Sequence, residues 1–199
     1  MKRISLSLLF CASLFVVGCK NNQGENETEN QMEVEETSEM NQNNMESEEP
    51  QEITVNLEAK SGSDLAGTIT FTEEDGEVTM EGTITGLSEG THAIHIHEKA
   101  DCSAEDGTSA GGHWNPTNQP HGEWGDEEGY HRGDIGNFEV NSDGEGTIDF
   151  STDEWCIGCD DPNKNIVGKA IIVHDGVDDY TSQPSGDAGT RVGCAEITM

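Results

Sequence analysis

The stretch Thr91–Glu98, with the sequence THAIHIHE, decides how the chain folds. Residues two apart on a β-strand point to the same face of the sheet. His95 and His97 therefore share one face. Ile94 and Ile96 share the other face, which we expect to point into a core. The sequence thus predicts a strand that buries isoleucines on one side and presents two imidazoles, which are good metal ligands, on the other.

Short runs of alternating apolar and polar residues continue on both sides of this stretch, from Ile53 onward, separated by Gly, Asp and Ser clusters. Such runs indicate antiparallel strands, and no segment has a convincing helical period. The sequence predicts an all-β sandwich or barrel of about eight strands. The first three contain Ile53–Ala59, Ile69–Phe71 and Val78–Ile84, and the later ones are expected at Thr91–Glu98, Asp134–Val140, Gly146–Ser151, Ile166–His174 and Arg191–Thr198.

Two connections in this pattern are unusually long, Lys99–Gly133 and Asp175–Thr190. Loops longer than about 12–15 residues are uncommon unless they are functional or disordered. Each of these begins where a histidine-bearing strand ends. We therefore expect both loops to fold back over one site.

The histidines are confined to one part of the chain. All seven lie between His92 and His174, and the first 91 residues contain none. They are His92, His95, His97, His113, His121, His131 and His174. Imidazole nitrogen suits both copper and zinc, and Asp134, three residues after His131, can supply an oxygen ligand. The pattern predicts a metal site with several histidine ligands.

Six motifs, in order, resemble copper/zinc superoxide dismutase over the range from about Ile53 to Met199. They are HAIHIHE at His92–Glu98, GGHWNP at Gly111–Pro116, HGEWG at His121–Gly125, HRGDIGN at His131–Asn137, IIVH at Ile171–His174 and SGDAGTRVGC at Ser185–Cys194. The resemblance implies an all-β, eight-stranded antiparallel Greek-key β-sandwich or barrel with two long functional loops.

The same resemblance implies one copper and one zinc per chain. The implied copper ligands are His95, His97, His113 and His174. The implied zinc ligands are His113, His121, His131 and Asp134. His113 would then bridge the two metals as a deprotonated imidazole. His92 corresponds to a structural histidine, and Asp178 to the carboxylate that links His95 to His121.

The resemblance implies the enzyme activity as well. In the family, copper alternates between two oxidation states and converts superoxide to O₂ and H₂O₂, and the bridging imidazole takes up a proton when copper is reduced. Arg191 corresponds to the arginine that guides the anion. From Ile53 onward there are thirty acidic and six basic residues, so a local positive charge is needed against a repelling field. Asp175–Thr190 contains no lysine, so steering by lysines in this loop, known in parts of the family, is absent.

The cysteines fall into two groups within the expected domain. The resemblance implies a disulfide between Cys102 and Cys194. Cys156 and Cys159 form a C-x-x-C motif, which is compatible with a redox pair, half of a zinc site or a small disulfide. No second C-x-x-C and no βαβ setting accompany it, so we favour the disulfide.

The N-terminal residues predict export. Two basic residues precede an apolar run that ends in Val16-Val17-Gly18-Cys19, which resembles the lipobox of bacterial lipoproteins. We expect residues 1–18 to be a signal peptide, Cys19 to be lipidated, residues 19–52 to be an acidic disordered tether, and residues 53–199 to be the copper/zinc superoxide dismutase domain. The protein would then be exported and lipid-anchored in the bacterial cell envelope, facing the periplasm or the outside, where it protects against oxidative damage.

The net charge of −32 restricts the partners. Such a chain should avoid nucleic acid and anionic lipid, so we expect superoxide as substrate, membrane contact only through the lipid anchor, and a monomer or homodimer. Two other functions remain compatible with the sequence. One is a non-enzymatic envelope protein that binds copper and zinc without turnover, and the other is a structural or adhesive sandwich domain.

Overall fold

The computed structural model describes residues 50–199. The predictions of a signal peptide, a lipidated Cys19 and an acidic tether lie outside the described residues. Among the residues described, no helix is long and apolar enough to cross a membrane.

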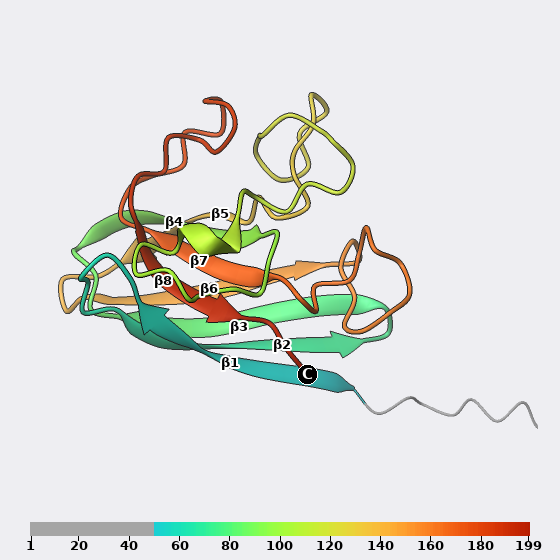
Figure 1. Cartoon of the computed structure of the whole chain (residues 1–199), viewed down its shortest axis with the longest axis horizontal. Helices are drawn as coiled ribbons and strands as arrows, with labels where there is room; N and C mark the ends of the chain where they lie inside the picture. The colour runs from blue at the N-terminus through green and yellow to red at the C-terminus, as the bar shows by residue number, and fades with distance from the viewer. Residues whose placement is uncertain (1–49) are drawn as a thin grey trace, which may run out of the picture. The chain divides into compact units, whose positions relative to one another are not determined.

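Eight antiparallel strands close into a barrel, which confirms the predicted fold class (Figure 1). The strands are β1 (Gln51–Ala59), β2 (Ala66–Glu74), β3 (Glu77–Thr85), β4 (Gly90–His97), β5 (Gly136–Val140), β6 (Glu145–Thr152), β7 (Ala170–His174) and β8 (Arg191–Glu196). The only helical segment in the described part of the chain is the 3₁₀ turn η1 (Thr108–Ala110).

The order of strands around the barrel is β1-β2-β3-β6-β5-β4-β7-β8. Successive strands mostly pair as neighbours, but β3 leads to β4 and β6 leads to β7 across the barrel, three positions away in each case. These two crossovers make the Greek-key arrangement. They also bring β4 and β7, which carry four of the seven histidines, side by side, with Ile94 opposite Val173.

A tight hairpin between β2 and β3 shows how local sequence sets the register. Asp75 and Gly76 both have positive φ, 52° and 82°, and the flanking residues Glu74 and Glu77 pair directly. Asp-Gly favours this turn, whose twist matches that of the strands it joins. The hairpin therefore fixes which faces of β2 and β3 point inward.

The barrel interior holds the apolar residues of the alternating runs. Ile94 and Ile96 are 1% and 0% exposed and belong to the main core cluster, as predicted. His95 and His97 are also buried, at 0% and 1% exposure, but on the opposite face of β4. Because that face lies outside the barrel, the two long loops must cover it.

Strand β7 begins four residues later than expected, at Ala170 instead of Ile166. The amide of Lys169 donates to the carbonyl of Ile166 at 3.1 Å, and Gly168 has a φ of 86°, so these residues form a turn. Ile166 is fully buried all the same, which explains why its apolar character resembled that of a strand residue. The ends of the other later strands differ from expectation by at most two residues.

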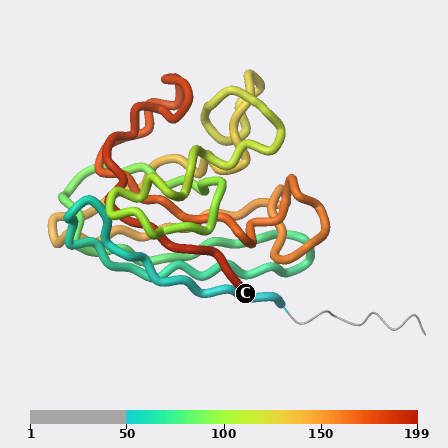
Figure 2. Tube along the Cα trace, viewed as in Figure 1, coloured from blue at the N-terminus to red at the C-terminus, as the bar shows by residue number. Residues whose placement is uncertain are grey.

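The β4–β5 loop and the β7–β8 loop rise from the same side of the barrel, in yellow and red respectively (Figure 2). They are joined to each other there. The amide of His121 donates to Oε1 of Gln183 at 2.9 Å, and Nε2 of Gln183 donates to the carbonyl of His121 at 2.8 Å. This confirms that both loops fold back over one region of the barrel surface.

Two disulfides are present in the described residues. Cys102–Cys194 joins the β4–β5 loop to β8, and Cys156–Cys159 closes a short turn after β6. Cys194 is fully buried and Cys102 nearly so. The first disulfide therefore fastens a loop segment that faces the histidines to the rigid barrel.

We expect the Cys102→Ser/Cys194→Ser double variant to lose about 4–5 kcal/mol of unfolding free energy, because the disulfide closes a loop with a sequence separation of 92 residues. Chemical denaturation of the metal-free protein measures this. The matched control is Cys156→Ser/Cys159→Ser, whose closed loop is much shorter and for which we expect a loss of about 1.5 kcal/mol. Equal losses in the two variants would contradict this account.

Candidate metal centre

Four histidines meet on the outer face of the barrel. His95 and His97 come from β4, and His174 from the end of β7. His113 arrives from the β4–β5 loop, where it forms an isolated β-bridge with His97. The amide of Trp114 donates to the carbonyl of Ile96 at 2.8 Å and continues this contact, so the backbone of β4 itself positions His113.

These four side chains turn unpaired nitrogens toward one another. Nδ1 of His95 and Nε2 of His97, His113 and His174 are buried without a hydrogen-bond partner, and the four candidate ligand atoms lie within 4.8 Å of one another. A buried polar atom without a partner costs about 1–3 kcal/mol. Four such atoms around one point match the donor set of a copper ion, for which imidazole is a suitable ligand.

The other ring nitrogens of the group fix its orientation. Nδ1 of His97 lies 3.0 Å from the carbonyl oxygen of Gly111, and Nδ1 of His174 lies 3.4 Å from that of Gly189. Contacts of this kind set the tautomer of a ligating histidine and hold its ring in place.

A second cluster adjoins the first, and it consists of His113, His121, His131 and Asp134. Nδ1 of the three histidines lies 2.8, 3.0 and 3.2 Å, respectively, from a carboxylate oxygen of Asp134. The second and third of these nitrogens are within ion-pair distance but lack hydrogen-bond geometry. Three imidazoles and one carboxylate around a shared point are the donor set of a closed zinc site.

The backbone holds Asp134 in this position. The amide of His131 donates to Oδ2 of Asp134 at 2.7 Å, and the amide of Gly122 donates to the same atom at 3.2 Å. The amide of Asp134 donates to the carbonyl of His131 at 3.1 Å. Two of the four side chains thus come from one tight turn, so the geometry of the cluster depends on that turn.

His113 belongs to both clusters. Its Nε2 is one of the unpaired atoms of the first cluster, and its Nδ1 lies 2.8 Å from Oδ1 of Asp134 in the second. The side chain is 1% exposed. One imidazole therefore faces two candidate metal positions through its two nitrogens.

Burial favours the neutral form of the imidazoles in the first cluster. Desolvation lowers the pKa of His113 to about 4, despite the opposing hydrogen bond of Asp134, and lowers the pKa of His174 to about 3. Burial also holds the pKa of His97 well below its usual range. Neutral imidazole is the form that binds a metal, so the metal-free protein is prepared for binding at neutral pH.

The second cluster is electrostatically different. Burial opposes the charged form of His121, but the hydrogen bond to Asp178 and the negative charges of Asp134 and Asp178 outweigh it and raise the pKa of His121 to about 9. Burial likewise opposes the carboxylate of Asp134, yet hydrogen bonds from the ring of His113 and the amide of His131 hold its pKa well below the usual range. The ionised carboxylate is therefore always available as a ligand.

Asp178 connects the two clusters through a second path. Its Oδ2 lies 2.7 Å from Nε2 of His95, and its Oδ1 lies 2.9 Å from Nε2 of His121. Asp178 is 1% exposed. Gly186 must be glycine, because its φ is 65° and a Cβ there would overlap Asp178 and crowd His121. Asp178 thus contacts His95 and His121, the two residues that the resemblance implies it links.

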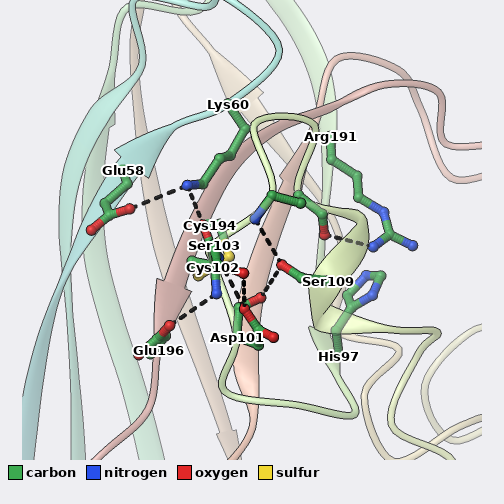
Figure 3. The surroundings of a disulfide bond; sticks show 12 residues. Glu58, Lys60, His97, Asp101, Cys102, Ser103, Ser109, Arg191, Cys194 and Glu196 are labelled. Carbon is green, nitrogen blue, oxygen red and sulfur yellow. Dashed lines mark hydrogen bonds and ion pairs between the residues drawn. A yellow bond between two sulfur atoms is a disulfide. The ribbon is translucent and has the colours of Figure 1, made fainter.

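Arg191 lies at the edge of the first cluster, at the start of β8. Its Nη1 and Nη2 donate to the carbonyl oxygens of Gly107 and Gly111, each at 2.8 Å. The carbonyl of Gly111 is also the one that Nδ1 of His97 contacts. Figure 3 shows the guanidinium group beside the imidazole of His97. One loop segment therefore holds both side chains.

A buried lysine supports this loop segment from behind, which the sequence analysis did not predict. Lys60 is 8% exposed, and its Nζ donates to the carbonyl of Cys102 and to Oε2 of Glu58 (Figure 3). The amide of Cys102 donates to Oε1 of Glu196 at 2.9 Å. No motif marks Lys60, because its partner is a backbone carbonyl.

His92 stands apart from both clusters, as expected. Its two ring nitrogens lie 3.1 and 2.9 Å from the carbonyl oxygens of His174 and Ser88. It is therefore a structural residue that joins β4 to its surroundings. The structure brings together every residue predicted as a metal ligand.

The comparisons with known proteins agree with this geometry. Residues 65–197 match the family described as copper/zinc superoxide dismutase (SODC). Cu-Zn superoxide dismutase 5 of Dictyostelium discoideum is 37% identical over 146 residues, which are 69% of this chain and 93% of the relative. An extracellular Cu-Zn superoxide dismutase of Caenorhabditis elegans is 33% identical over 144 residues, which are 69% of this chain and 63% of the relative.

Solved structures share the fold. The clock protein EA4 is 34% identical, with a TM-score of 0.63 over 74% of this chain and 95% of that one. A doubly substituted SOD-like protein from Bacillus subtilis is also 34% identical, with a TM-score of 0.66 over 73% of this chain and 97% of that one.

The fold and the two clusters define a two-site metalloprotein on a Greek-key barrel. The chain belongs to the copper/zinc superoxide dismutase family. It is therefore an oxidoreductase that dismutes superoxide, and its cofactors are copper and zinc.

We expect the metal-free protein to lose roughly 5 kcal/mol of unfolding free energy as the pH falls from about 6.5 to about 4, since each of His113 and His174 contributes up to about 1.4 kcal/mol per pH unit. Across this range the unfolded chain protonates both imidazoles, whereas the folded protein keeps them largely neutral. The opposite contribution of His121 is fully present below pH 6.5 and is lost only as the pH rises to about 9. Denaturation at several pH values measures the slope.

The control for this measurement is His174→Gln, which removes one of the imidazoles with a lowered pKa and leaves His97 and His113. We expect it to show about two thirds of the slope of the unsubstituted protein. Stability that stays constant from pH 6.5 to 4 would contradict the neutral, buried state of these imidazoles.

Proposed function

We propose that the first cluster holds copper and the second holds zinc, with His113 as the ligand that the two metals share. The copper ligands are His95, His97, His113 and His174, and the zinc ligands are His113, His121, His131 and Asp134. The observation that carries this assignment is the set of buried, unpaired ring nitrogens that converge within each cluster.

The choice of metal for each cluster follows from its donors. The first offers four imidazoles on a barrel face and lies beside Arg191, so a copper there remains close to an anion-binding group. The second offers three imidazoles and the Asp134 carboxylate, a set that closes a tetrahedral zinc site. Zinc has no redox chemistry and serves there to hold the loop and His113.

Copper bound in the first cluster would supply the redox chemistry, in which one superoxide is oxidised to O₂ and a second, with two protons that come from water, is reduced to H₂O₂. The chain itself supplies position and passes on a proton. We assign Nε2 of His113 as the atom that takes up a proton and returns it during the cycle. Nδ1 of His113, held on the side of Asp134, keeps the ring in place meanwhile. Asp178 fixes the orientation of His95 and His121.

Arg191 is the residue that we assign to the substrate anion. Its guanidinium group is permanently charged, half-buried and fixed by two carbonyl oxygens beside His97. Most of the other charges on the domain are negative, so this group is a local positive focus in a repelling field. Its fixed position beside His97 directs superoxide to the first cluster.

We further infer that the enzyme works outside the cytoplasm, as a lipoprotein anchored through Cys19 in the bacterial cell envelope, with the domain at residues 53–199. The lipobox-like sequence before Cys19 supports the anchor. The two disulfides support an oxidising compartment, and one relative is named an extracellular enzyme. In that position it would remove superoxide that reaches the envelope.

The purified protein should contain about one copper and one zinc per chain, with superoxide dismutation that is lost when copper is removed and regained when it is restored. Elemental analysis and an activity assay on the same sample test this. Full occupancy by both metals without turnover would contradict the enzyme and favour a protein that only holds the metals.

We expect Arg191→Ala to lower the rate constant for superoxide by about tenfold and to weaken its dependence on salt, because the focusing charge is lost. The rate constant of Arg191→Lys should lie between those of the unsubstituted protein and Arg191→Ala. Lysine keeps the charge but loses the paired hydrogen bonds to the carbonyls of Gly107 and Gly111. Rates at several ionic strengths measure both effects, with copper content as the control. A rate unchanged in Arg191→Ala would show that this residue does not guide the anion.

A further inference from the structure

The turn closed by Cys156–Cys159 belongs to neither histidine cluster, yet it is firmly fixed to the barrel. The amide of Cys156 donates to the carbonyl of Lys164 at 2.9 Å, and the amide of Ile166 donates to the carbonyl of Cys156 at 3.0 Å. The amide of Ile157 donates to Oε2 of Glu73 at 2.6 Å. The two residues just before the disulfide therefore stand on a rigid base.

Those two residues, Glu154 and Trp155, contact the backbone and side chains on both sides of His131. The hydroxyl of Tyr130 donates to Oε2 of Glu154 at 2.8 Å, and the guanidinium group of Arg132 pairs with the same oxygen. Nε1 of Trp155 donates to the carbonyl of Arg132 at 2.9 Å. His131 is thus held between two anchored neighbours.

Aromatic packing extends this support along the β4–β5 loop. The ring of Trp124 lies 4.9 Å from that of Tyr130, 4.9 Å from that of Phe150 and 5.7 Å from that of Trp155, measured between centroids. Trp155 is 1% exposed. The loop between His121 and Asp134 therefore rests on an aromatic base next to the disulfide turn.

Ion pairs between side chains are few in the described part of the chain. Two ion pairs without histidine are present among residues 50–199, Lys60–Glu58 and Arg132–Glu154. Lys60 supports the loop segment beside Arg191, on the copper side. Arg132–Glu154 lies on the zinc side, where a shift of the turn at residues 130–132 would displace the ring of His131.

We propose that Glu154 is a positioning residue for the zinc site: it anchors Tyr130 and Arg132, and through them it holds His131 where zinc needs it. The disulfide turn serves this role by fixing Glu154 and Trp155. The inference rests on the proposed assignment of His131 as a zinc ligand. It gives the C-x-x-C motif a function in metal retention, without redox chemistry of its own.

The test is the rate at which the metal-loaded full-length protein releases zinc to a chelator. We expect Glu154→Ala to release zinc about 3–10-fold faster, since partners outside the ligand set commonly change metal affinity by 10–100-fold and this one acts through the backbone. Glu154→Gln should release zinc more slowly than Glu154→Ala but faster than the unsubstituted protein, because glutamine can still accept the hydrogen bond of Tyr130. The control is Asp153→Ala, an exposed neighbouring carboxylate, which should behave as the unsubstituted protein.

A second measurement separates positioning from general stability. Cobalt(II) placed in the zinc site has visible absorption that depends on ligand geometry, so Glu154→Ala should change that spectrum while the copper spectrum changes less. Unchanged zinc release and an unchanged cobalt spectrum in Glu154→Ala would overturn the proposal. If His131→Ala releases zinc no faster than the unsubstituted protein, the zinc-ligand assignment itself is wrong, and the inference that rests on it is overturned too.

The disulfide turn is tested by the same release assay. Cys156→Ser/Cys159→Ser should also release zinc faster than the unsubstituted protein, because Glu154 loses its fixed base. Release as slow as in the unsubstituted protein would overturn the role given to the disulfide.

Discussion

Buried imidazole nitrogens that have no partner within the protein are the constraint on which the rest of the structure depends. Six of them, from His95, His97, His113, His121, His131 and His174, surround two points that share one ring. Each costs about 1–3 kcal/mol unless a metal satisfies it. Such an arrangement needs a rigid frame, and the closed barrel provides one, because β4 and β7 pair directly beneath the cluster.

Loops without regular structure hold the remaining ligands, so they need their own anchors. Beside the first cluster, the proposed copper site, these are the Cys102–Cys194 disulfide, buried Lys60 and the carbonyls that fix Arg191. Beside the second cluster, the proposed zinc site, the Arg132–Glu154 pair anchors the loop. Asp178 joins the two sides through one carboxylate. Three of the six basic side chains from Ile53 onward, those of Lys60, Arg132 and Arg191, thus hold loop segments beside the two clusters.

Much of this was predictable from the sequence, for identifiable reasons. Alternation of apolar and polar residues revealed the strands, and the motifs around His95 and His113 identified the candidate ligands, because side-chain chemistry is visible in the sequence. The contacts of Arg191 and Lys60 were not predictable, because their partners are backbone carbonyls of loops. The role of Glu154 was hidden for a similar reason: it depends on Tyr130 and Arg132, which only the folded loop brings to it.

The most direct test of the account is a crystal structure of the metal-loaded protein with anomalous data collected at the copper and zinc absorption edges. The account predicts a copper signal among His95, His97 and His174, and a zinc signal beside Asp134, with the ring of His113 between the two metals. A single metal, or two metals that do not share His113, would contradict it.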